Sequence, residues 1–236
     1  MRHKLEYPNQ GVCGKYKKRV DVVIFMHSQL VKVNLSGKRV FVHHGGSAYR
    51  EKHKKLNKIF NPIVKRSIIQ TADLLGLGAK NEVWLLPGID TESIKPVYER
   101  HEKVIIGHFP SKARIKNSKA INKVISRLKG DFEYIYSPEG VTWEKQMERM
   151  SKCDVYIDGC MPKINKRRYG EWGMAALEAA ALGKVVISHF LSQDKYKGKC
   201  GIKVANSPAE IESHLKALLA LTDEELLKEK QATRAW

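Results

Sequence analysis

The sequence has few cysteines and no long apolar run. Its four cysteines, Cys13, Cys153, Cys160 and Cys200, form no CxxC pair and no closely spaced framework. This argues against a disulfide-rich secreted fold and against a zinc site built on cysteine pairs. No apolar stretch approaches the roughly 18 to 20 residues that a membrane span needs. The start of the chain, MRHKLEYPNQ, lacks the apolar core of a signal peptide. We therefore expect reduced thiols and a cytoplasmic protein, with peripheral membrane contact left open.

Acidic residues are scarce relative to basic ones. The 236 residues include 43 Lys and Arg against 25 Asp and Glu, a formal net charge of +18. A hydrophobic content of 42% is too high for a disordered basic tail, so this charge lies on a folded body. Met1 to Lys95 has 18 basic and 7 acidic residues, a net charge of +11. Such a surface favours polyanionic partners, including nucleic acid, anionic lipid headgroups and phosphorylated small molecules.

Short β-branched runs alternate with helical patterns along the chain. Predicted strands lie at Val20 to Phe25, Val40 to His44, Val83 to Leu86, Val104 to Gly107, Phe132 to Tyr136, Val155 to Asp158 and Val185 to Ser188. Predicted helices lie at Lys119 to Leu128, Trp143 to Ser151, Met174 to Leu182 and Ala209 to Leu221. Several strands are apolar throughout, as in parallel strands that are covered on both faces. The pattern predicts an α/β protein with parallel sheets.

A polar, turn-rich segment divides the chain. Residues 87–103, PGIDTESIKPVYERHEK, suit a crossover between two lobes, and we place the boundary near Pro96. Residues 1–96 then form a shortened N-terminal lobe of three or four strands, and residues 97–236 form a larger C-terminal lobe. Ser207 and Thr222, each followed three residues later by Glu, predict the starts of two closing helices.

The segment YGEWGMAALEAAALGKVVI, residues 169–187, carries the strongest chemical signal. Gly170 and Gly173 precede an apolar helix that contains one carboxylate, Glu178, predicted on the same face as Met174. A carboxylate on an apolar face needs a partner, and the two hydroxyls of a ribose would supply donors. The helix start offers backbone amides and a dipole to a phosphate. The alternative is a buried helix whose glutamate is paired internally or reaches solvent at its edge.

A loop rich in cations follows the first strand of the C-terminal lobe. In HFPSKARIKNS, residues 108–118, Arg114 and Lys116 lie two residues apart, close enough in sequence to reach one diphosphate. Ligands in open α/β sheets bind at the carboxyl ends of strands, where this loop falls. The alternative is an ordinary solvated loop.

These segments together resemble the nucleotide-sugar glycosyltransferases of the GT-B fold, specifically the retaining family 4. The family motif EGFGxxxLEAMAxGxPVI is similar to GEWGMAALEAAALGKVVI, and CDVYIDG, HFPSKARIKNS and LLPGIDTESIKP resemble three other family segments. The matching motif positions are Gly173, Leu177, Glu178, Ala179, Gly183, Val186 and Ile187. The first glutamate of the motif falls on Gly170, and Glu171 stands one place later. The resemblance implies two Rossmann-like lobes that transfer a sugar from a nucleotide-diphosphate donor with retention, without a bound metal or other cofactor.

The resemblance also implies roles for particular residues. The implied donor-binding residues are Ser111, Arg114, Lys116, Gly170, Gly173, Met174 and Glu178. Glu171 and His44 are the implied catalytic residues. VFVHHGGSAYR resembles the family's HGSDxR segment, with Gly45, Gly46 and Arg50 on the acceptor side. The added glycine leaves open whether His43 or His44 is the site histidine.

Two basic segments bear on the acceptor. Arg50 to Arg66 has seven Lys and Arg with an apolar stripe near helical spacing, which Pro62 must kink or restart. It suits an anionic membrane, a nucleic-acid backbone, or a solvated helix packed on its own lobe. Pro162 to Arg168 adds four positive charges. If the protein is such a transferase, we expect the acceptor to be a lipid-linked glycan or a nucleic-acid base. The alternatives are an inactive GT-B descendant that binds nucleotides or a partner, and a basic nucleic-acid-binding module.

Overall fold

The computed structural model describes residues 21–30, 34–161, 163–164, 167–168, 170–196 and 198–236. The chain forms two compact units, Met1–Leu86 and Pro87–Trp236. The division precedes the predicted boundary at Pro96 because the start of the crossover segment is tied to the second unit. The Arg234 guanidinium donates a hydrogen bond of 2.6 Å to the Thr91 carbonyl, and Ile94 is buried. None of the helices in the described part of the chain is long and apolar enough to span a membrane.

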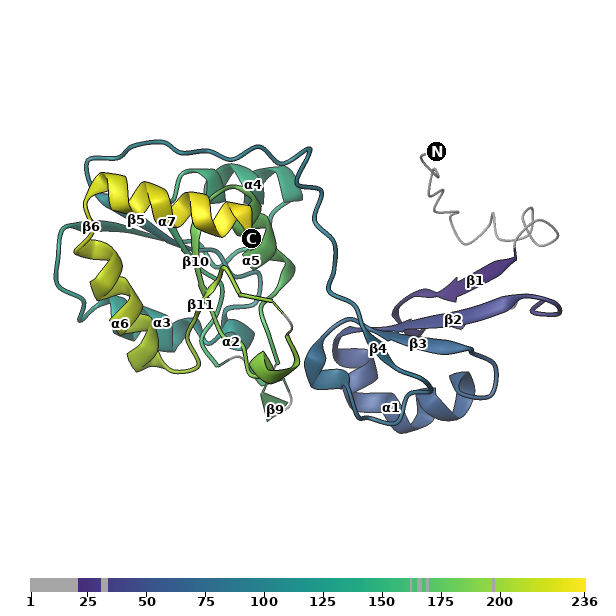
Figure 1. The fold of residues 1–236 in the computed structure, drawn as a ribbon. Helices are drawn as coiled ribbons and strands as arrows, with labels where there is room; N and C mark the ends of the chain where they lie inside the picture. Colours follow the sequence, from purple (N-terminus) through teal and green to yellow (C-terminus); the bar gives the residue numbers. More distant parts are fainter. Residues whose placement is uncertain (1–20, 31–33, 162, 165–166, 169, 197) are drawn as a thin grey trace. The chain divides into compact units, whose positions relative to one another are not determined.

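The first unit contains a four-stranded parallel sheet in the order β1-β2-β3-β4 (Figure 1). Its elements are β1 (Val22–Phe25), β2 (Arg39–His44), α1 (Gly46–Phe60), β3 (Arg66–Ile69) and β4 (Val83–Trp84), with short 3-10 turns at Met26–Ser28 and Ala72–Leu74. The apolar side of α1 packs on the sheet, where Phe60 meets Phe25 and Val42. This packing uses the apolar stripe that the sequence showed between residues 50 and 66.

Helix α1 differs in its bounds from the sequence pattern, and β3 was not predicted. The helix ends at Phe60, two residues before Pro62, since a proline and the residue before it are excluded from a helix interior. The chain then turns and enters β3, whose Phe41–Arg66 and His44–Ile69 pairings place it beside β2. The basic stretch, in which we expected Pro62 to kink or restart a helix, is therefore a helix, a turn and the first residue of a strand.

The second unit contains a five-stranded parallel sheet in the order β11-β10-β7-β5-β6. Its strands are β5 (Val104–His108), β6 (Phe132–Tyr136), β7 (Val155–Ile157), β10 (Val185–Ser188) and β11 (Lys203–Val204). Its helices are α2 (Ala113–Lys116), α3 (Ser118–Ile125), α4 (Trp143–Ser151), α5 (Met174–Ala181), α6 (Pro208–Leu219) and α7 (Asp223–Ala235), and β8 (Lys163–Ile164) pairs with β9 (Arg167–Arg168). Every residue of β7 and β10 is buried, as their apolar sequences predict. The predicted α/β class with parallel sheets is confirmed.

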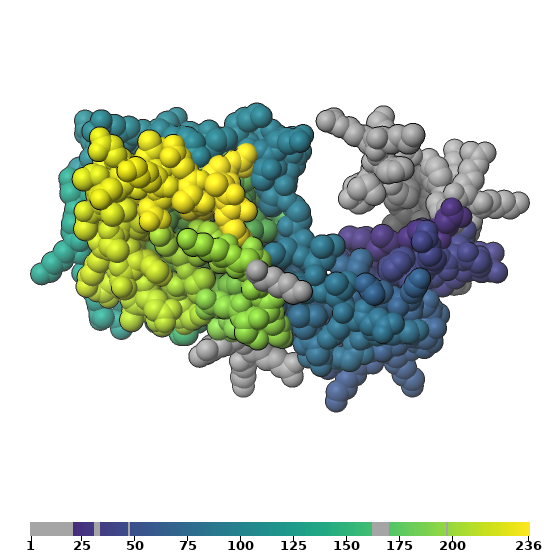
Figure 2. All heavy atoms as spheres, viewed as in Figure 1, coloured from purple at the N-terminus to yellow at the C-terminus, as the bar shows by residue number. Residues whose placement is uncertain are grey.

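The helices of the second unit cover both faces of its sheet. Helices α3 and α6 pack together on one face, whereas α5 contacts both α4 and α7 on the other (Figure 1). Figure 2 shows α6, in yellow-green, and α7, in yellow, at the surface of this unit. Ser207 and Thr222 cap α6 and α7 as predicted, and Thr222 forms a complete capping box with Glu225. The core between the layers includes Ile106 and Ile187.

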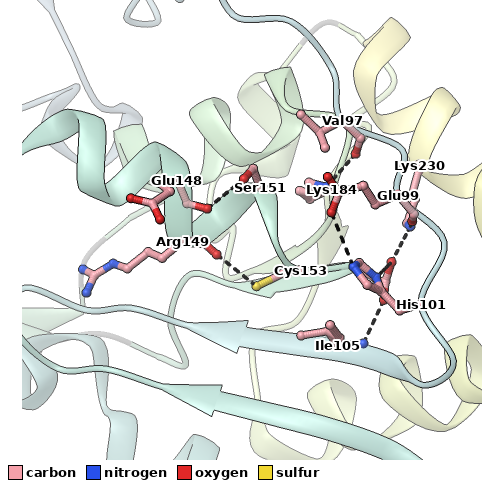
Figure 3. A network of polar contacts seen from close by, with 11 residues as sticks. Val97, Glu99, His101, Ile105, Glu148, Arg149, Ser151, Cys153, Lys184 and Lys230 are labelled. Atoms are coloured by element: carbon pink, nitrogen blue, oxygen red, sulfur yellow. Dashed lines mark hydrogen bonds and ion pairs between the residues drawn. The ribbon is translucent and has the colours of Figure 1, made fainter.

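A buried polar network joins the crossover segment to α7 (Figure 3). Asp154 accepts hydrogen bonds from the Ile105 amide at 2.8 Å and from His101 Nδ1 at 3.1 Å, and it pairs with the Lys230 ammonium. Lys184 Nζ donates to the Val97 carbonyl at 2.6 Å. Burial and the nearby Lys230 lower the pKa of Lys184 to about 8. The network fixes the crossover segment, which opens the second unit, onto the amino end of the second sheet.

Candidate functional site

A buried carboxylate, Asp158, collects three donors at the carboxyl end of β7. Lys116 Nζ lies 2.7 Å from its Oδ1, and the Gly173 amide donates to its Oδ2 at 3.1 Å. The Ser188 hydroxyl, at the end of β10, donates to Oδ2 at 3.1 Å. The arrangement therefore joins the end of α2, the ends of two central strands and the start of α5. Ligands of open α/β sheets bind at this edge.

The electrostatics of this cluster keep Asp158 ionised. Its side chain is fully buried, and burial alone would raise its pKa. The Lys116 ammonium outweighs that effect, aided by His189 and the Gly173 amide, and the pKa of Asp158 is lowered to about 2. The result is an ion pair between a buried carboxylate and a partly exposed ammonium, placed directly beneath a helix start. Sequence reasoning did not select Asp158, although a carboxylate that closes the apolar run VYID was a visible signal.

Lys116 is held along its whole length. It is the last residue of α2, and Asn117, with a φ of 54°, turns the chain into α3. The Cys160 amide donates to the Lys116 carbonyl at 3.1 Å. A Cβ added at Gly159 would lie 3.0 Å from Lys116 Cδ, and one added at Gly173 would lie 3.0 Å from Lys116 Nζ. The two glycines thus leave room for the lysine stem and its ammonium, whose side chain stays 23% exposed.

The other predicted residues of this loop lie at the surface. Ser111 and Arg114 are exposed, and Arg114 is on α2, two residues before Lys116. The structure therefore brings Lys116, but not these two side chains, into contact with the start of α5. Both remain accessible to a ligand.

The two predicted donor-binding residues on helix α5, Met174 and Glu178, differ in their exposure to solvent. Met174 is 40% exposed and Glu178 is half-buried, while the buried residues of this helix are Ala176, Ala179, Ala180 and Ala181. The prediction that Glu178 lies on a buried apolar face is wrong, because the small alanine side chains form the face that packs inward. Glu178 instead accepts a hydrogen bond of 3.0 Å from Trp143 Nε1, on α4.

The residues just before α5 are buried. Glu171 is 1% exposed, and Gly170 is buried with its carbonyl accepting a hydrogen bond of 2.8 Å from the Leu191 amide. Trp172 packs edge-on against Phe190, with ring centroids 4.3 Å apart. The turn that leads into the Gly173 cap is therefore a packed element.

The two adjacent histidines at the end of β2 have opposite environments. His44 is fully buried, stacks on Tyr49 with ring centroids 4.0 Å apart, and is hydrogen-bonded to Ser28 Oγ at 2.8 Å. His43 projects from the other face of the strand, is half-buried, and meets His27 edge-on at 5.2 Å. Of the two, His43 is the one that a ligand could reach.

The other N-terminal residues have contacts within their own unit. Arg50 is buried and donates to both carboxylate oxygens of Asp73, at 2.5 and 2.9 Å, and to Thr71 at 3.1 Å. A Cβ added at Gly45 would overlap the Gln70 side chain. Gly46 opens α1 with a φ of +66°, which favours glycine. The structure gives Arg50 and Gly45 packing roles, beside the acceptor role that the resemblance implied.

The basic face of α1 is open to solvent. Four lysines on it are exposed, namely Lys52, Lys54, Lys55 and Lys58. The apolar face of the helix is occupied by the unit's own sheet. This is the arrangement of a solvated helix packed on its lobe. The second basic segment forms the β8 and β9 pair, and the rest of residues 162–169 lies outside the described residues.

Two buried histidines should make the protein labile to mild acid. Burial lowers the pKa of His44 and of His108 to about 4 in each case. His108 donates from Nδ1 to the Ile157 carbonyl at 2.7 Å and accepts from Ser118 at Nε2. Because protonation favours the unfolded chain, where a histidine pKa is about 6.5, we expect full stability above pH 6.5 and a loss of roughly 3 kcal/mol per histidine between pH 6.5 and 4.

Urea unfolding at pH 7, 5.5 and 4 measures this loss. A His108→Asn variant should show a shallower dependence of its unfolding free energy on pH over the same range, whatever its stability at pH 7. An unfolding free energy that stays constant from pH 7 to 4 would contradict the assignment.

Comparison with known proteins identifies the fold. No family model and no curated protein matches this sequence. Among solved structures, Alr3699/HepE of Anabaena in complex with UDP-glucose has a TM-score of 0.63 at 10% identity, over 95% of this chain and 75% of that chain. An alpha-glucosyltransferase in complex with UDP and a 13-mer DNA containing an HMU base has a TM-score of 0.55 at 13% identity, over 96% of this chain and 78% of that chain.

A third similar structure is that of a UDP-forming synthase. The UDP-forming α,α-trehalose-phosphate synthase from Burkholderia xenovorans has a TM-score of 0.53 at 11% identity, over 84% of this chain and 65% of that chain. These neighbours are GT-B glycosyltransferases. At such low identity the likeness shows the fold, and the predicted GT-B architecture with two parallel sheets is confirmed.

Proposed function

We propose that this protein is a glycosyltransferase that moves a sugar from a nucleotide-diphosphate sugar to a polyanionic acceptor, with retention of configuration. The observation that carries the proposal is the Lys116–Asp158 pair beneath the Gly173 start of α5. It puts a cation beside a helix N-terminus at the ligand-binding edge of an α/β sheet. Neighbours of the same fold hold UDP or UDP-glucose in their crystal structures. We propose no cofactor beyond the donor itself.

For this transfer reaction the site must stabilise the negative charge on the departing diphosphate. In the reaction the bond between the sugar's anomeric carbon and the β-phosphate oxygen breaks, and its electrons remain on the diphosphate. An acceptor oxygen forms the new bond on the same face of the sugar, and its proton passes to the leaving phosphate oxygen. Lys116, the accessible Arg114 and the first-turn amides of α5 oppose the charge that develops on the leaving group.

Glu178 is suited to the nucleoside of the donor. It lies just over one turn into α5, on the side of exposed Met174, and its carboxylate is half-buried. A ribose has two hydroxyl donors for such a carboxylate.

His44 and Glu171 are too buried to touch a substrate, so we assign the acceptor-side histidine to His43.

The acceptor that we favour is a nucleic-acid base. The exposed lysines of α1 offer charge to a phosphate backbone, whereas membrane insertion through this helix would need the apolar face that already packs on the sheet. One structural neighbour was crystallised with DNA that contains an HMU base. A lipid-linked glycan is the competing acceptor.

A transfer screen tests the proposal. Labelled UDP-, GDP- and ADP-sugars are offered with DNA containing hydroxymethylated bases or with lipid-linked glycans in anionic vesicles. We expect transfer to DNA from one donor, with an acceptor KM that rises steeply with salt. Nucleotide binding without turnover on any acceptor would instead indicate an inactive descendant. DNA binding without nucleotide binding would indicate a nucleic-acid-binding module.

A Glu178→Ala variant should raise the donor KM by about 10- to 100-fold, because hydrogen bonds to a charged group are lost. The matched control is Trp143→Phe, which removes the indole donor to Glu178 but keeps the carboxylate and should change the donor KM less than threefold. Initial-rate kinetics over donor concentration measure both. Equal effects of the two substitutions would argue that Glu178 acts only by packing against α4.

A further inference from the structure

We propose that Asp158 is a positioning residue, which sets the Lys116 ammonium and the start of α5 in the arrangement that receives the donor diphosphate. The inference rests on the proposed function, because it assigns a role within that site. Asp158 would not touch the substrate. It would act through Lys116 and the Gly173 amide.

The two oxygens of Asp158 have separate partners. Oδ1 faces the Lys116 ammonium at 2.7 Å, and Oδ2 accepts from the Gly173 amide and the Ser188 hydroxyl, both at 3.1 Å. An ammonium has three donors, of which the Oδ1 contact takes one. The Lys116 side chain is 23% exposed although its carboxylate partner is fully buried. The ammonium is thus anchored from below and remains open to a ligand.

The surrounding backbone supports one position of the lysine. Gly159 lies against the middle of the lysine stem and Gly173 against the ammonium, each at a distance that a methyl group would crowd. The backbone hydrogen bond from the Cys160 amide to the Lys116 carbonyl ties the end of α2 to the loop after β7. A lysine free in solution samples many rotamers, so fixing it before the ligand arrives lowers the entropy cost of binding.

A carboxylate beside an anion site has an electrostatic cost. By charge alone, Asp158 repels a phosphate, so replacing it with neutral asparagine should tighten the binding of a diphosphate. Positioning predicts the opposite result, because without the anchor Lys116 leaves the start of α5. The sign of the change in affinity therefore separates the two roles.

The test compares UDP dissociation constants, measured by titration calorimetry, for the wild type, Asp158→Asn and Asp158→Asn/Lys116→Met. We expect the first substitution to weaken UDP binding by about tenfold, as loss of one charged hydrogen bond implies. We expect the second to add less than a threefold loss, because Lys116 is already displaced. The double variant leaves no buried charge unpaired, so it avoids the folding defect expected of Lys116→Met alone.

Ser188→Ala is the matched control. It removes one hydrogen bond to Asp158 but leaves the lysine contact, and should change UDP affinity less than twofold. Asp158→Asn binding UDP as tightly as the wild type or tighter overturns the inference. So does a tenfold or greater loss on removing Lys116 from the Asp158→Asn background. If the wild type itself binds no UDP, GDP or ADP, the proposed function fails and this inference fails with it.

Discussion

An Arg114→Ala/Lys116→Met variant is expected to transfer sugar about 1000-fold more slowly than the wild type, since loss of one preorganised charge-stabilising donor costs about 100- to 1000-fold in kcat. Lys116 is fixed beside the start of α5, and Arg114 is accessible on the same short helix. Both would oppose charge that develops as the diphosphate leaves. Single-turnover kinetics at saturating donor measure the effect on the chemical step.

Stability must be separated from catalysis in this variant. Removing Lys116 leaves Asp158 buried without its cation, at an expected cost of about 3 to 5 kcal/mol. The same pair of substitutions is therefore also made with Asp158→Asn, which should restore most of the unfolding free energy but not the rate.

Lys112→Ala/Lys119→Ala is the charge-matched control. Both lysines are exposed in the same region, and their loss should change the rate less than threefold. If this control loses as much activity as the Arg114/Lys116 pair, the effect comes from net charge rather than from the site.

Lys230→Met is expected to destabilise the second unit by about 3 to 5 kcal/mol, the cost of a buried pair that loses one partner. Lys230 is 5% exposed and Asp154 is 3% exposed. Asp154 also accepts hydrogen bonds from His101 and from the Ile105 amide. The loss of Lys230 therefore disturbs the network that holds the crossover segment (Figure 3). Urea unfolding followed by circular dichroism measures the change.

Two further variants show whether the loss of stability in Lys230→Met comes from the buried ion pair. Asp154→Asn/Lys230→Met removes both charges and should recover most of the lost stability, because an amide oxygen can still accept from Ile105. Lys228→Met, on the exposed side of the same helix, should change the unfolding free energy by less than about 0.5 kcal/mol. A Lys230→Met protein as stable as Lys228→Met would mean that the buried pair contributes nothing net.

The sequence predicted regular structure best where one cause dominated. The apolar strands β7 and β10 and the caps at Ser207 and Thr222 were confirmed, since burial on both faces and capping chemistry are local signals. Strand β3 escaped prediction because its basic start, Arg66, continued the charge pattern of α1. The boundary between an amphipathic helix and a short, half-buried strand is hard to locate from the sequence when the two elements are adjacent.

The site shows where pattern reasoning reaches its limit. Periodicity put Glu178 on the apolar face of α5, yet alanines fill that face and leave the glutamate at its edge with Trp143. The sequence alone did not show whether His43 or His44 is accessible to a ligand. Adjacent side chains on a strand point to opposite faces of the sheet, and only the packed unit shows which face α1 covers.

The amino-acid sequence by itself determined that this is a folded, basic α/β protein with parallel sheets and a glycine-started helix in its second half. Composition, strand periodicity and helix caps act locally, so they can be read along the chain. Only the tertiary structure joined Lys116, Asp158 and Gly173, which are separated by up to 57 positions in sequence, into one cluster around a buried carboxylate. This grouping depends on the tertiary fold, because parallel strands from distant parts of the chain end at the same edge of a sheet, where their terminal side chains meet.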